Sequence, residues 1–172
     1  MNFNEETVKK NYVYNGKILN LRRDDVLLPN GESAIREVIE HSGGSSILCV
    51  KDGKVLLVKQ FRYPYKEVIW EIPAGKKNPD ETPEETAIRE LEEEGGVRAK
   101  SVEKLFEIYP SPAYTEEIIY IFKAIDFVET EIHLDSDEFL TGEWVEISRA
   151  KEMLFSGEIK DAKTIIALST LF

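Results

Sequence analysis

The chain has 172 residues, of which 42% are hydrophobic and 32% are charged, which is typical of one folded domain and excludes a disordered protein. Its formal net charge of −11 argues against nucleic acid or anionic membranes as partners, and no apolar run is long enough to cross a bilayer. The N-terminus lacks the apolar segment of a signal peptide, and the single cysteine, Cys49, lies in an apolar run as a buried thiol would, so we expect a cytoplasmic protein.

The first 45 residues have the pattern of β-strands. Asn15-Gly16 and Asn30-Gly31 each separate two strand-like runs, which is a strong signal for a hairpin. The glycine-rich stretch at 41–46 is a plausible hinge. We therefore expect residues 1–44 to form a β meander of their own, ahead of a second domain over 45–172.

The middle of the chain predicts three strands and then a helix. Two apolar strands over 45–61 are joined by Asp52-Gly53, and a third, over 68–72, ends at Pro73. Thr82 is a good N-cap for the helix and Glu85 completes a capping box. Gly95-Gly96 ends this helix.

Strand patterns return over 102–109, 116–127 and 142–147, and two helices close the chain. Ser148 is the expected N-cap of the first of these helices, and Asp161 that of the second. Many strands, a helix, further strands and then helices predict an α+β fold, with helices packed on a mixed sheet.

The helix over 83–94 has an unusual end, because Glu90, Glu93 and Glu94 lie close together on one side of it. Carboxylates are disfavoured near the carbonyl end of a helix, and like charges at this spacing repel. A hard divalent cation such as Mg²⁺ or Mn²⁺ would relieve the repulsion. The alternative is a solvated acidic face with no ligand.

The residues around this cluster follow a spaced pattern: Gly75, five residues, Glu81, seven residues, Arg89-Glu90-Leu91, one residue, Glu93-Glu94, one residue, Gly96-Val97. The pattern resembles the Nudix box at every fixed position. The resemblance implies a Nudix α/β/α sandwich with a mixed sheet over 45–172, preceded by the N-terminal β-strand sub-domain. It also implies Mg²⁺-dependent hydrolysis of the pyrophosphate in a nucleoside diphosphate that is linked to another group.

The resemblance also implies a set of metal ligands. Glu90 and Glu94 would be the principal ligands, Glu93 a further ligand or catalytic support, and the backbone carbonyl of Ala74 another ligand. Two or more Mg²⁺ ions, with Mn²⁺ as the alternative, would neutralise the phosphates and activate a water molecule. Arg89 lies four residues before Glu93 and could hold a carboxylate in place, although an ordinary surface ion pair is the alternative.

Four further segments, "LLVKQFRYP", "WEIPAG", "YPSPAYTEE" and "FSGEIKDAKTIIAL", resemble the ADP-ribose pyrophosphatase branch of the family. This branch would hydrolyse ADP-ribose, or a related ADP-sugar, to AMP and a sugar phosphate, ribose 5-phosphate in the case of ADP-ribose. Three alternatives remain open. They are hydrolysis of another nucleotide sugar such as GDP-mannose, a non-catalytic Nudix-like ligand sensor, and sanitation of nucleoside triphosphates.

The branch resemblance suggests four substrate-binding residues. Arg62 would contact phosphate or ribose, because its guanidinium is a forked and permanently charged donor. Glu71 and Glu117 would accept hydrogen bonds from ribose hydroxyls or hold Arg62, and surface charges are the alternative for both. Pro112 lies sixteen residues after Gly96, where this branch carries a proline, and a simple loop kink is the alternative.

A base is expected outside the box helix, because the carboxylates of that helix would be occupied by metal. The branch often places it in the loop over 133–143, where Glu138 is our choice and Asp137 the alternate. This acidic loop could equally be a solvated lid. The two histidines, His41 and His133, are too isolated to predict a catalytic pair.

The branch also implies a homodimer in which the N-terminal strands are exchanged between subunits. Phe3, Tyr12 and Tyr14 are then candidates to clamp adenine, although packing in the strand core is the expected role of each. No nucleic-acid or membrane partner is expected, and the partner molecule is a small nucleoside diphosphate sugar.

Overall fold

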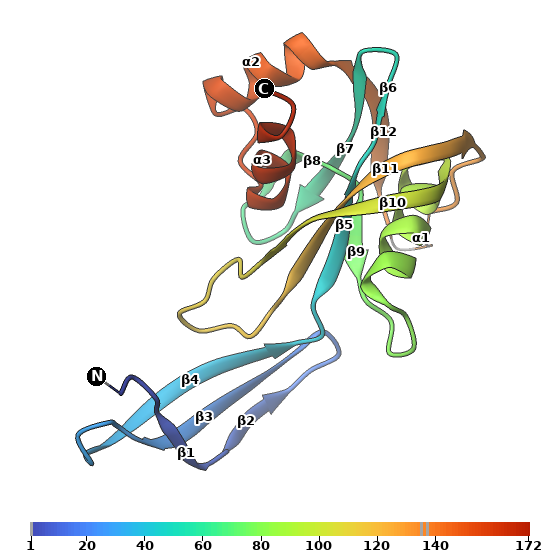
Figure 1. Cartoon of the computed structure of the whole chain (residues 1–172). Coiled ribbons are helices and arrows are strands. Elements are labelled where there is room, and N and C mark those ends of the chain that lie inside the picture. The colour runs from blue at the N-terminus through green and yellow to red at the C-terminus, as the bar shows by residue number, and fades with distance from the viewer. Residues whose placement is uncertain (1, 135, 137) are drawn as a thin grey trace. The chain divides into compact units, whose positions relative to one another are not determined.

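The computed structural model describes residues 2–134, 136 and 138–172, which form two compact units. The smaller unit runs to Gly43 and also contains Tyr109–Ile118, and the larger unit contains Gly44–Ile108 and Ile119–Phe172. A stretch from the middle of the chain therefore belongs to the same unit as the N-terminal strands (Figure 1).

The described residues form twelve strands and three helices (Figure 1). In chain order they are β1 (Glu6–Lys9), β2 (Tyr12–Asn15), β3 (Leu19–Leu27), β4 (Ser33–His41), β5 (Gly44–Leu48), β6 (Val50–Lys51), β7 (Lys54–Arg62), β8 (Glu67–Glu71), β9 (Ala74–Lys76), α1 (Pro83–Gly95), β10 (Val97–Ile108), β11 (Ile119–Glu129), β12 (Leu140–Glu146), α2 (Ile147–Ser156) and α3 (Ala162–Ser169).

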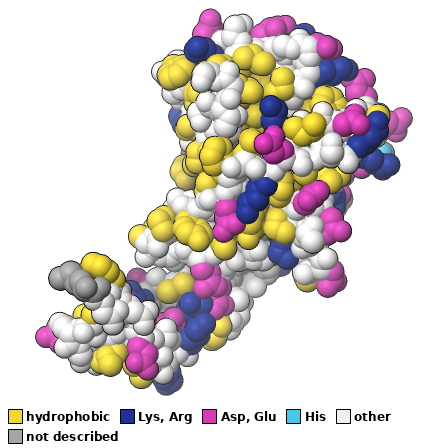
Figure 2. Space-filling view, viewed as in Figure 1, with side chains coloured by type: hydrophobic (Ala, Val, Ile, Leu, Met, Phe, Trp, Pro, Cys, Tyr) yellow, Lys and Arg dark blue, Asp and Glu magenta, His cyan; other side chains and the backbone are white. Residues whose placement is uncertain are grey.

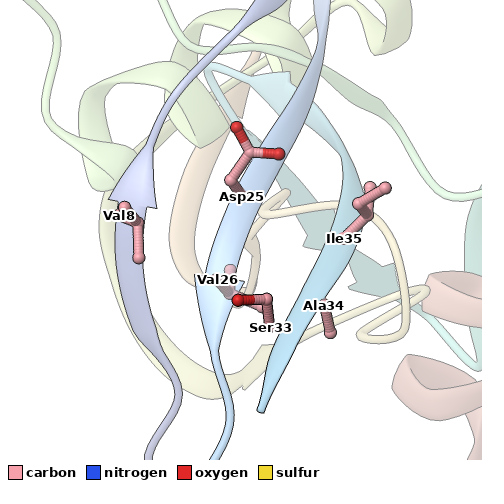
Figure 3. Close-up of a pocket in the computed structure, with 6 residues that line it drawn as sticks. All are labelled: Val8, Asp25, Val26, Ser33, Ala34 and Ile35. Carbon is pink, nitrogen blue, oxygen red and sulfur yellow. The ribbon is translucent and has the colours of Figure 1, made fainter. Parts of the chain in front are cut away.

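The smaller unit is an antiparallel sheet built around β3, which pairs with β1, β2 and β4. Both predicted hairpins are confirmed, since Asn15 pairs with Asn20 and Leu27 with Ser33 across the two Asn-Gly turns. A pocket of about 420 Å³ lies on this sheet (Figure 3). Its lining residues are Val8, Asp25, Val26, Ser33, Ala34 and Ile35.

The stretch 109–118 is attached to β4 through Ile39. The Ile39 N–H donates to the carbonyl of Tyr114 at 2.7 Å, and the Ile39 carbonyl accepts from the N–H of Glu116 at 3.1 Å. Arg22 adds an ion pair to Glu116 at 3.2 Å, and it also binds Asp24 and Glu40. The connection between β10 and β11 is thus held by the N-terminal sheet.

The N-terminal aromatic side chains do not pack in the strand core, so that expectation was wrong. Phe3, Tyr12 and Tyr14 are exposed, and the hydroxyl of Tyr12 donates to Glu40 at 3.0 Å. A small sheet has too little volume to cover large aromatic rings, so these side chains stay exposed.

The larger unit has a central layer of two sheets. One has the order β10-β11-β5-β9 and is mixed, because β11 and β5 are parallel, and the other joins β12, β7, β6 and β8 by antiparallel pairs. Helix α1 covers one face, and α2 and α3 cover the other (Figure 1). The two faces carry separate cores, one with Ala87 and Leu91 of α1 and one with Met153 and Leu168 of α2 and α3. This is the expected α+β fold.

The helix ends follow the sequence signals with one exception. Thr82 and Glu85 form the predicted capping box of α1, Gly96 ends that helix with a left-handed φ of 62°, and Asp161 caps α3. Ser148 does not cap α2, because that helix starts directly at the end of β12, with Glu146 at the N-cap and no side-chain hydrogen bond. The tight strand-to-helix junction takes precedence over the local capping preference.

The surface and the lone thiol agree with the composition. Acidic and basic side chains are interspersed with hydrophobic ones over the face shown in Figure 2. No helix in the described part of the chain is long and apolar enough to cross a membrane. Cys49 is fully buried as expected, and burial raises its pKa to about 12, so this thiol is unreactive.

Candidate active site

The acidic end of α1 turns inward. Glu90 and Glu94 are almost fully buried residues, with 5% and 2% exposure. The Glu90 carboxylate occupies the place where Gly75 of β9 would carry a side chain, since a Cβ there would lie 1.9 Å from Glu90 Oε1. The glycine in the box is therefore a steric requirement for the position of Glu90.

Arg89 is the cation that holds the cluster together. Its guanidinium donates to Glu81, Glu90 and Glu93, each at 2.7 Å, and to the carbonyl of Lys76 at 3.2 Å. Glu81 also accepts from Thr86 and from the backbone of Asn78, and the hydrogen bonds from Arg89 are the main reason that its pKa falls to about 2. Glu81 thus anchors the loop ahead of the helix through Arg89.

Glu94 has no comparable cationic partner among the described residues. Its Oε2 accepts from the backbone N–H of Ala74 at 2.9 Å, which ties the end of α1 to the start of β9. Burial raises the pKa of Glu94 to about 8, and the negative charges of Glu90, Glu138 and Glu71 add to the effect. Burial likewise raises the pKa of Glu90 to about 7, although Arg89 opposes it. The site therefore has a deficit of positive charge.

The residues present fit a divalent cation by their chemistry. Buried carboxylates with raised pKa values are the oxygen ligands that Mg²⁺ and Mn²⁺ prefer. Ser45 faces Gly75 across the β5–β9 pair, and its buried hydroxyl has no partner within the described residues. No three Asp, Glu, His or Cys side chains among those residues are yet gathered as metal ligands would be. Glu90 and Glu93 are instead bound to Arg89, and Glu94 is bound to the N–H of Ala74.

A second charged group lies at the ends of β7 and β8. Arg62 donates to Glu71 through Nε at 2.6 Å and through Nη2 at 2.7 Å, in a bidentate pair. Glu71 is 2% exposed and also binds Lys163, which in turn contacts Asp161 at 3.0 Å. Burial alone would raise the pKa of Glu71, but Arg62 and Lys163 outweigh it and lower the pKa.

These groups lie within electrostatic reach of one another. The charge of Glu94 acts on Arg62, that of Glu71 acts on Glu94, and that of Glu138 acts on both Glu90 and Glu94. The larger unit thus brings the box carboxylates and the Arg62–Glu71 pair together, since Ala74, which binds Glu94, lies three residues after Glu71. Glu138 lies near enough for its charge to act on Glu90 and Glu94. Asp137, the alternate base, lies outside the described residues.

Comparison with known proteins agrees with this geometry. The profile of the NUDIX domain matches residues 32–168, and that of the nucleoside diphosphate sugar hydrolase N-terminal domain matches residues 5–39. The chain belongs to the Nudix family.

Two relatives match almost the whole Nudix chain. An ADP-ribose pyrophosphatase of Bacillus subtilis is 42% identical over 170 residues, covering 97% of this chain and 92% of its own. A methanol dehydrogenase activator of Bacillus methanolicus is 37% identical over 172 residues, covering 98% and 93%. A GDP-mannose pyrophosphatase of Yersinia enterocolitica is 37% identical over 157 residues, covering 84% and 82%.

A solved structure described as an ADP compounds hydrolase superposes with a TM-score of 0.86 and covers 99% of this chain and 94% of its own. At 19% identity this likeness establishes the fold. Together with the intact box, the family membership makes this chain a Nudix pyrophosphohydrolase, an enzyme family that generally uses divalent metal.

Two of the predicted substrate residues lie outside the larger unit. Pro112 and Glu117 belong to the smaller unit, where Glu117 lies 3.3 Å from Nδ1 of His41 and Pro112 is exposed. Their part in this Nudix site stays a prediction. The neighbouring Glu116, not Glu117, is the residue that binds Arg22.

Sequence reasoning missed Lys163 and the second role of Asp161. Asp161 was expected only as a helix cap, yet it also binds Lys163. The available signal was a lysine inside the otherwise apolar segment "AKTIIAL". A buried lysine needs a carboxylate partner, but the sequence does not show that this partner is Glu71, 92 positions away.

Proposed function

We propose that this protein hydrolyses the pyrophosphate of ADP-ribose to AMP and ribose 5-phosphate, with Mg²⁺ as its cofactor. The proposal rests on one observation: the short segment 71–74 holds both the Arg62 guanidinium, through Glu71, and the buried Glu94 carboxylate, through the N–H of Ala74. It is supported by the ADP-ribose pyrophosphatase relative, which matches over nearly the whole chain. The substrate class is a nucleoside diphosphate joined to a sugar.

Glu90 and Glu94 would hold the metal, with Glu93 and the carbonyl of Ala74 as further ligands. When bound, two or more Mg²⁺ ions would neutralise the pyrophosphate and lower the pKa of a water molecule. Mn²⁺ satisfies the same donor set. Arg89 keeps Glu90 and Glu93 in position, and the Ala74 N–H does the same for Glu94.

The remaining steps fall to side chains outside the box helix. Arg62 would bind a phosphate or ribose oxygen with the donors that Glu71 leaves free. Glu138 would accept a proton from the attacking water, because its charge already acts on Glu90 and Glu94 without being tied to either. Hydrolysis then gives two monophosphates, and each leaves with its own negative charge.

GDP-mannose is the second candidate substrate, favoured by the GDP-mannose pyrophosphatase relative. The same metal site would serve both substrates, so the base and the sugar decide between them. A non-catalytic ligand sensor is less well supported, because every carboxylate of the box is present.

The test is a substrate screen with purified protein. ADP-ribose, other ADP-sugars, GDP-mannose and nucleoside triphosphates are incubated with Mg²⁺, and a coupled phosphatase releases phosphate from any monophosphate product. Triphosphates are scored by their pyrophosphate product. We expect the largest kcat/KM with ADP-ribose. A larger value with GDP-mannose would establish the second candidate, and no turnover of any compound would favour the sensor.

We also propose that the protein is a cytoplasmic homodimer, with residues 1–44 as the dimerisation sub-domain. The support is the exposed apolar surface of the smaller unit, which includes Phe3, Val8, Tyr12 and Tyr14. Large apolar side chains left exposed on a small unit are covered when a second copy packs on them. A fully buried, unreactive cysteine suits a reducing compartment.

A further inference from the structure

Lys163 occupies a position that is unfavourable for a lysine on two counts. It lies in the first turn of α3, where the helix dipole disfavours a cation. Its side chain is only 9% exposed, and burial of an ammonium group is costly unless it is paired. A methionine or leucine would fill the same place without either cost, so the charge of Lys163 needs a specific explanation.

The partners of Lys163 supply that explanation. Its Nζ binds Oε2 of Glu71 and lies 3.0 Å from Oδ1 of Asp161. Glu71 is the same carboxylate that holds Arg62, with Oε1 bound to Nε and Oε2 to Nη2. Glu71 is therefore fixed between two cations, one on a strand and one on a helix.

The backbone next to Glu71 is fixed to the same helix turn. The N–H of Ile72 donates to Oγ1 of Thr164 at 2.9 Å, and Thr164 donates in turn to Asp161 at 2.6 Å. Helix α3 lies beside β8 in the larger unit (Figure 1). The first turn of α3 is thus tied to the strand end next to Glu71 by a second bond, independent of the contact between the two long side chains.

Arg62 has donors left over after it binds Glu71. No described residue accepts from its Nη1, and the side chain is 38% exposed. A guanidinium held by one edge presents its other edge in a fixed direction, which is what recognition of an anionic oxygen requires.

We propose that Lys163 is a positioning residue for substrate binding: it fixes Glu71, which holds Arg62 with its free edge toward an anionic oxygen of the substrate. This inference rests on the proposed role of Arg62. Lys163 itself, being buried, touches no substrate. The role explains why the fold keeps a buried cation in the first turn of α3.

The test is a double-mutant cycle on kcat/KM. Lys163→Met should lower kcat/KM by about 10- to 100-fold, the usual range for a residue that orients a site group from outside. In an Arg62→Ala background the same change should cost less than about twofold, because its effect passes through Arg62. Equal losses in both backgrounds would overturn the proposal, since a purely structural defect does not depend on Arg62.

Two further variants serve as controls for the cycle. Lys163→Arg keeps the charge and should recover most of the activity. Lys160→Met removes a nearby exposed lysine, which pairs with Glu67 at 3.0 Å, and should leave kcat/KM within about twofold of wild type. If Lys163→Met does not fold, Lys163→Gln takes its place in the cycle. Its amide can still donate to Glu71 but carries no charge, so the loss of kcat/KM should be smaller and should again appear only when Arg62 is present.

A spectroscopic readout keeps this inference separate from the identity of the substrate. The Nε–H of Arg62 donates to Glu71, so it should give a protected ¹⁵N–¹H signal, identified by its loss in Arg62→Lys. We expect the signal to be lost or broadened in Lys163→Met and kept in Lys160→Met. An unchanged signal would refute the inference even if ADP-ribose is hydrolysed. A lost signal would support it even if ADP-ribose is not the substrate.

Discussion

In the proposed site, the negative charge of Glu94 is needed to bind metal but lowers the stability of the fold when no metal is present. The residue is 2% exposed and burial raises its pKa to about 8, so its charge destabilises the metal-free protein. We predict that Glu94→Gln lowers kcat by at least about 100-fold, beyond the upper end for groups that only support a metal site. Without metal, the Glu94→Gln variant should melt at the same temperature as wild type or higher. The buried charge is gone, and the glutamine amide oxygen can still accept from the N–H of Ala74.

Glu92 provides the matched control for this prediction. It lies in the same turn at a free position of the box and pairs with Arg98 at 2.7 Å. Glu92→Gln should therefore leave kcat unchanged. Steady-state kinetics and melting curves measured on both variants decide the matter, and near-normal turnover by Glu94→Gln would show that Glu94 is not a metal ligand.

Glu138 is the residue expected to act on the water molecule. If it works only in the transition state, Glu138→Gln should lower kcat and kcat/KM equally, by roughly 10²–10⁴-fold, with metal binding intact. The measurement is a full kinetic profile together with Mg²⁺ titration. A rise in KM alone would make Glu138 a substrate contact, and a larger kcat effect of Asp137→Asn would move the base to that position.

The raised pKa values of Glu90 and Glu94 predict a pH dependence with a definite sign. A carboxyl whose pKa is higher in the folded than in the unfolded state stabilises the fold below about pH 4.5 and loses this effect as pH rises through the folded value. With folded pKa values of about 7 and 8, the metal-free protein should become less stable as the pH rises through this range.

Melting curves measured in a chelator and in Mg²⁺ test this prediction. The melting temperature in chelator should fall from about pH 5, just above the unfolded pKa, and level off above about pH 8, where both carboxyls are ionised in the folded protein as well. Mg²⁺ at ten times its dissociation constant adds about 1.4 kcal/mol, or roughly 3–6 °C for a domain of this size, and most of the gain should appear at the higher pH. The Glu90→Gln/Glu94→Gln double variant should show neither effect.

At the scale of elements, the pairing of β9 with the end of α1 determines the site. A methyl group on Gly75 would lie 1.9 Å from Glu90 Oε1, so the carboxylate would have to move. We predict that Gly75→Ala lowers kcat/KM by about 10- to 100-fold and raises the Mg²⁺ concentration needed for half-maximal rate.

Gly142 on β12 is the comparison for this change. It has no left-handed φ, and the nearest atom to an added Cβ is the carbonyl oxygen of Glu94 at 3.3 Å. Gly142→Ala asks that carbonyl to shift by only a few tenths of an ångström, so it should change the metal requirement much less than Gly75→Ala does. The rate is measured against Mg²⁺ concentration for both variants. Equal curves would mean that the Mg²⁺ requirement does not depend on the position of the Glu90 carboxylate.

At the scale of the whole molecule, the prediction concerns assembly. The smaller unit exposes Phe3 at 80%, Val8 at 67% and Tyr14 at 58%, which is costly to leave in water. We predict a dimer in analytical ultracentrifugation at assay concentration. Removal of residues 1–44 should abolish both the dimer and the activity. A monomeric and fully active wild type would exclude this role for the N-terminal strands.

The sequence by itself determined the local features of this protein. The Asn-Gly turns, the capping box at Thr82 and the left-handed Gly96 depend on a few neighbouring residues, so their signals can be read from the chain. The Nudix box belongs to the same class, since its spacing places three carboxylates on one side of a single helix.

Only the tertiary structure decided which distant groups meet. Glu71 and Lys163 lie 92 positions apart, and the sequence around either residue does not identify the other as its partner. The stretch 109–118 joined the N-terminal unit through Ile39, although its sequence neighbours lie in the larger one. Contacts of this kind are set by the packing of whole sheets and helices. The free energy of this packing is spread over many residues, so no short sequence motif encodes it.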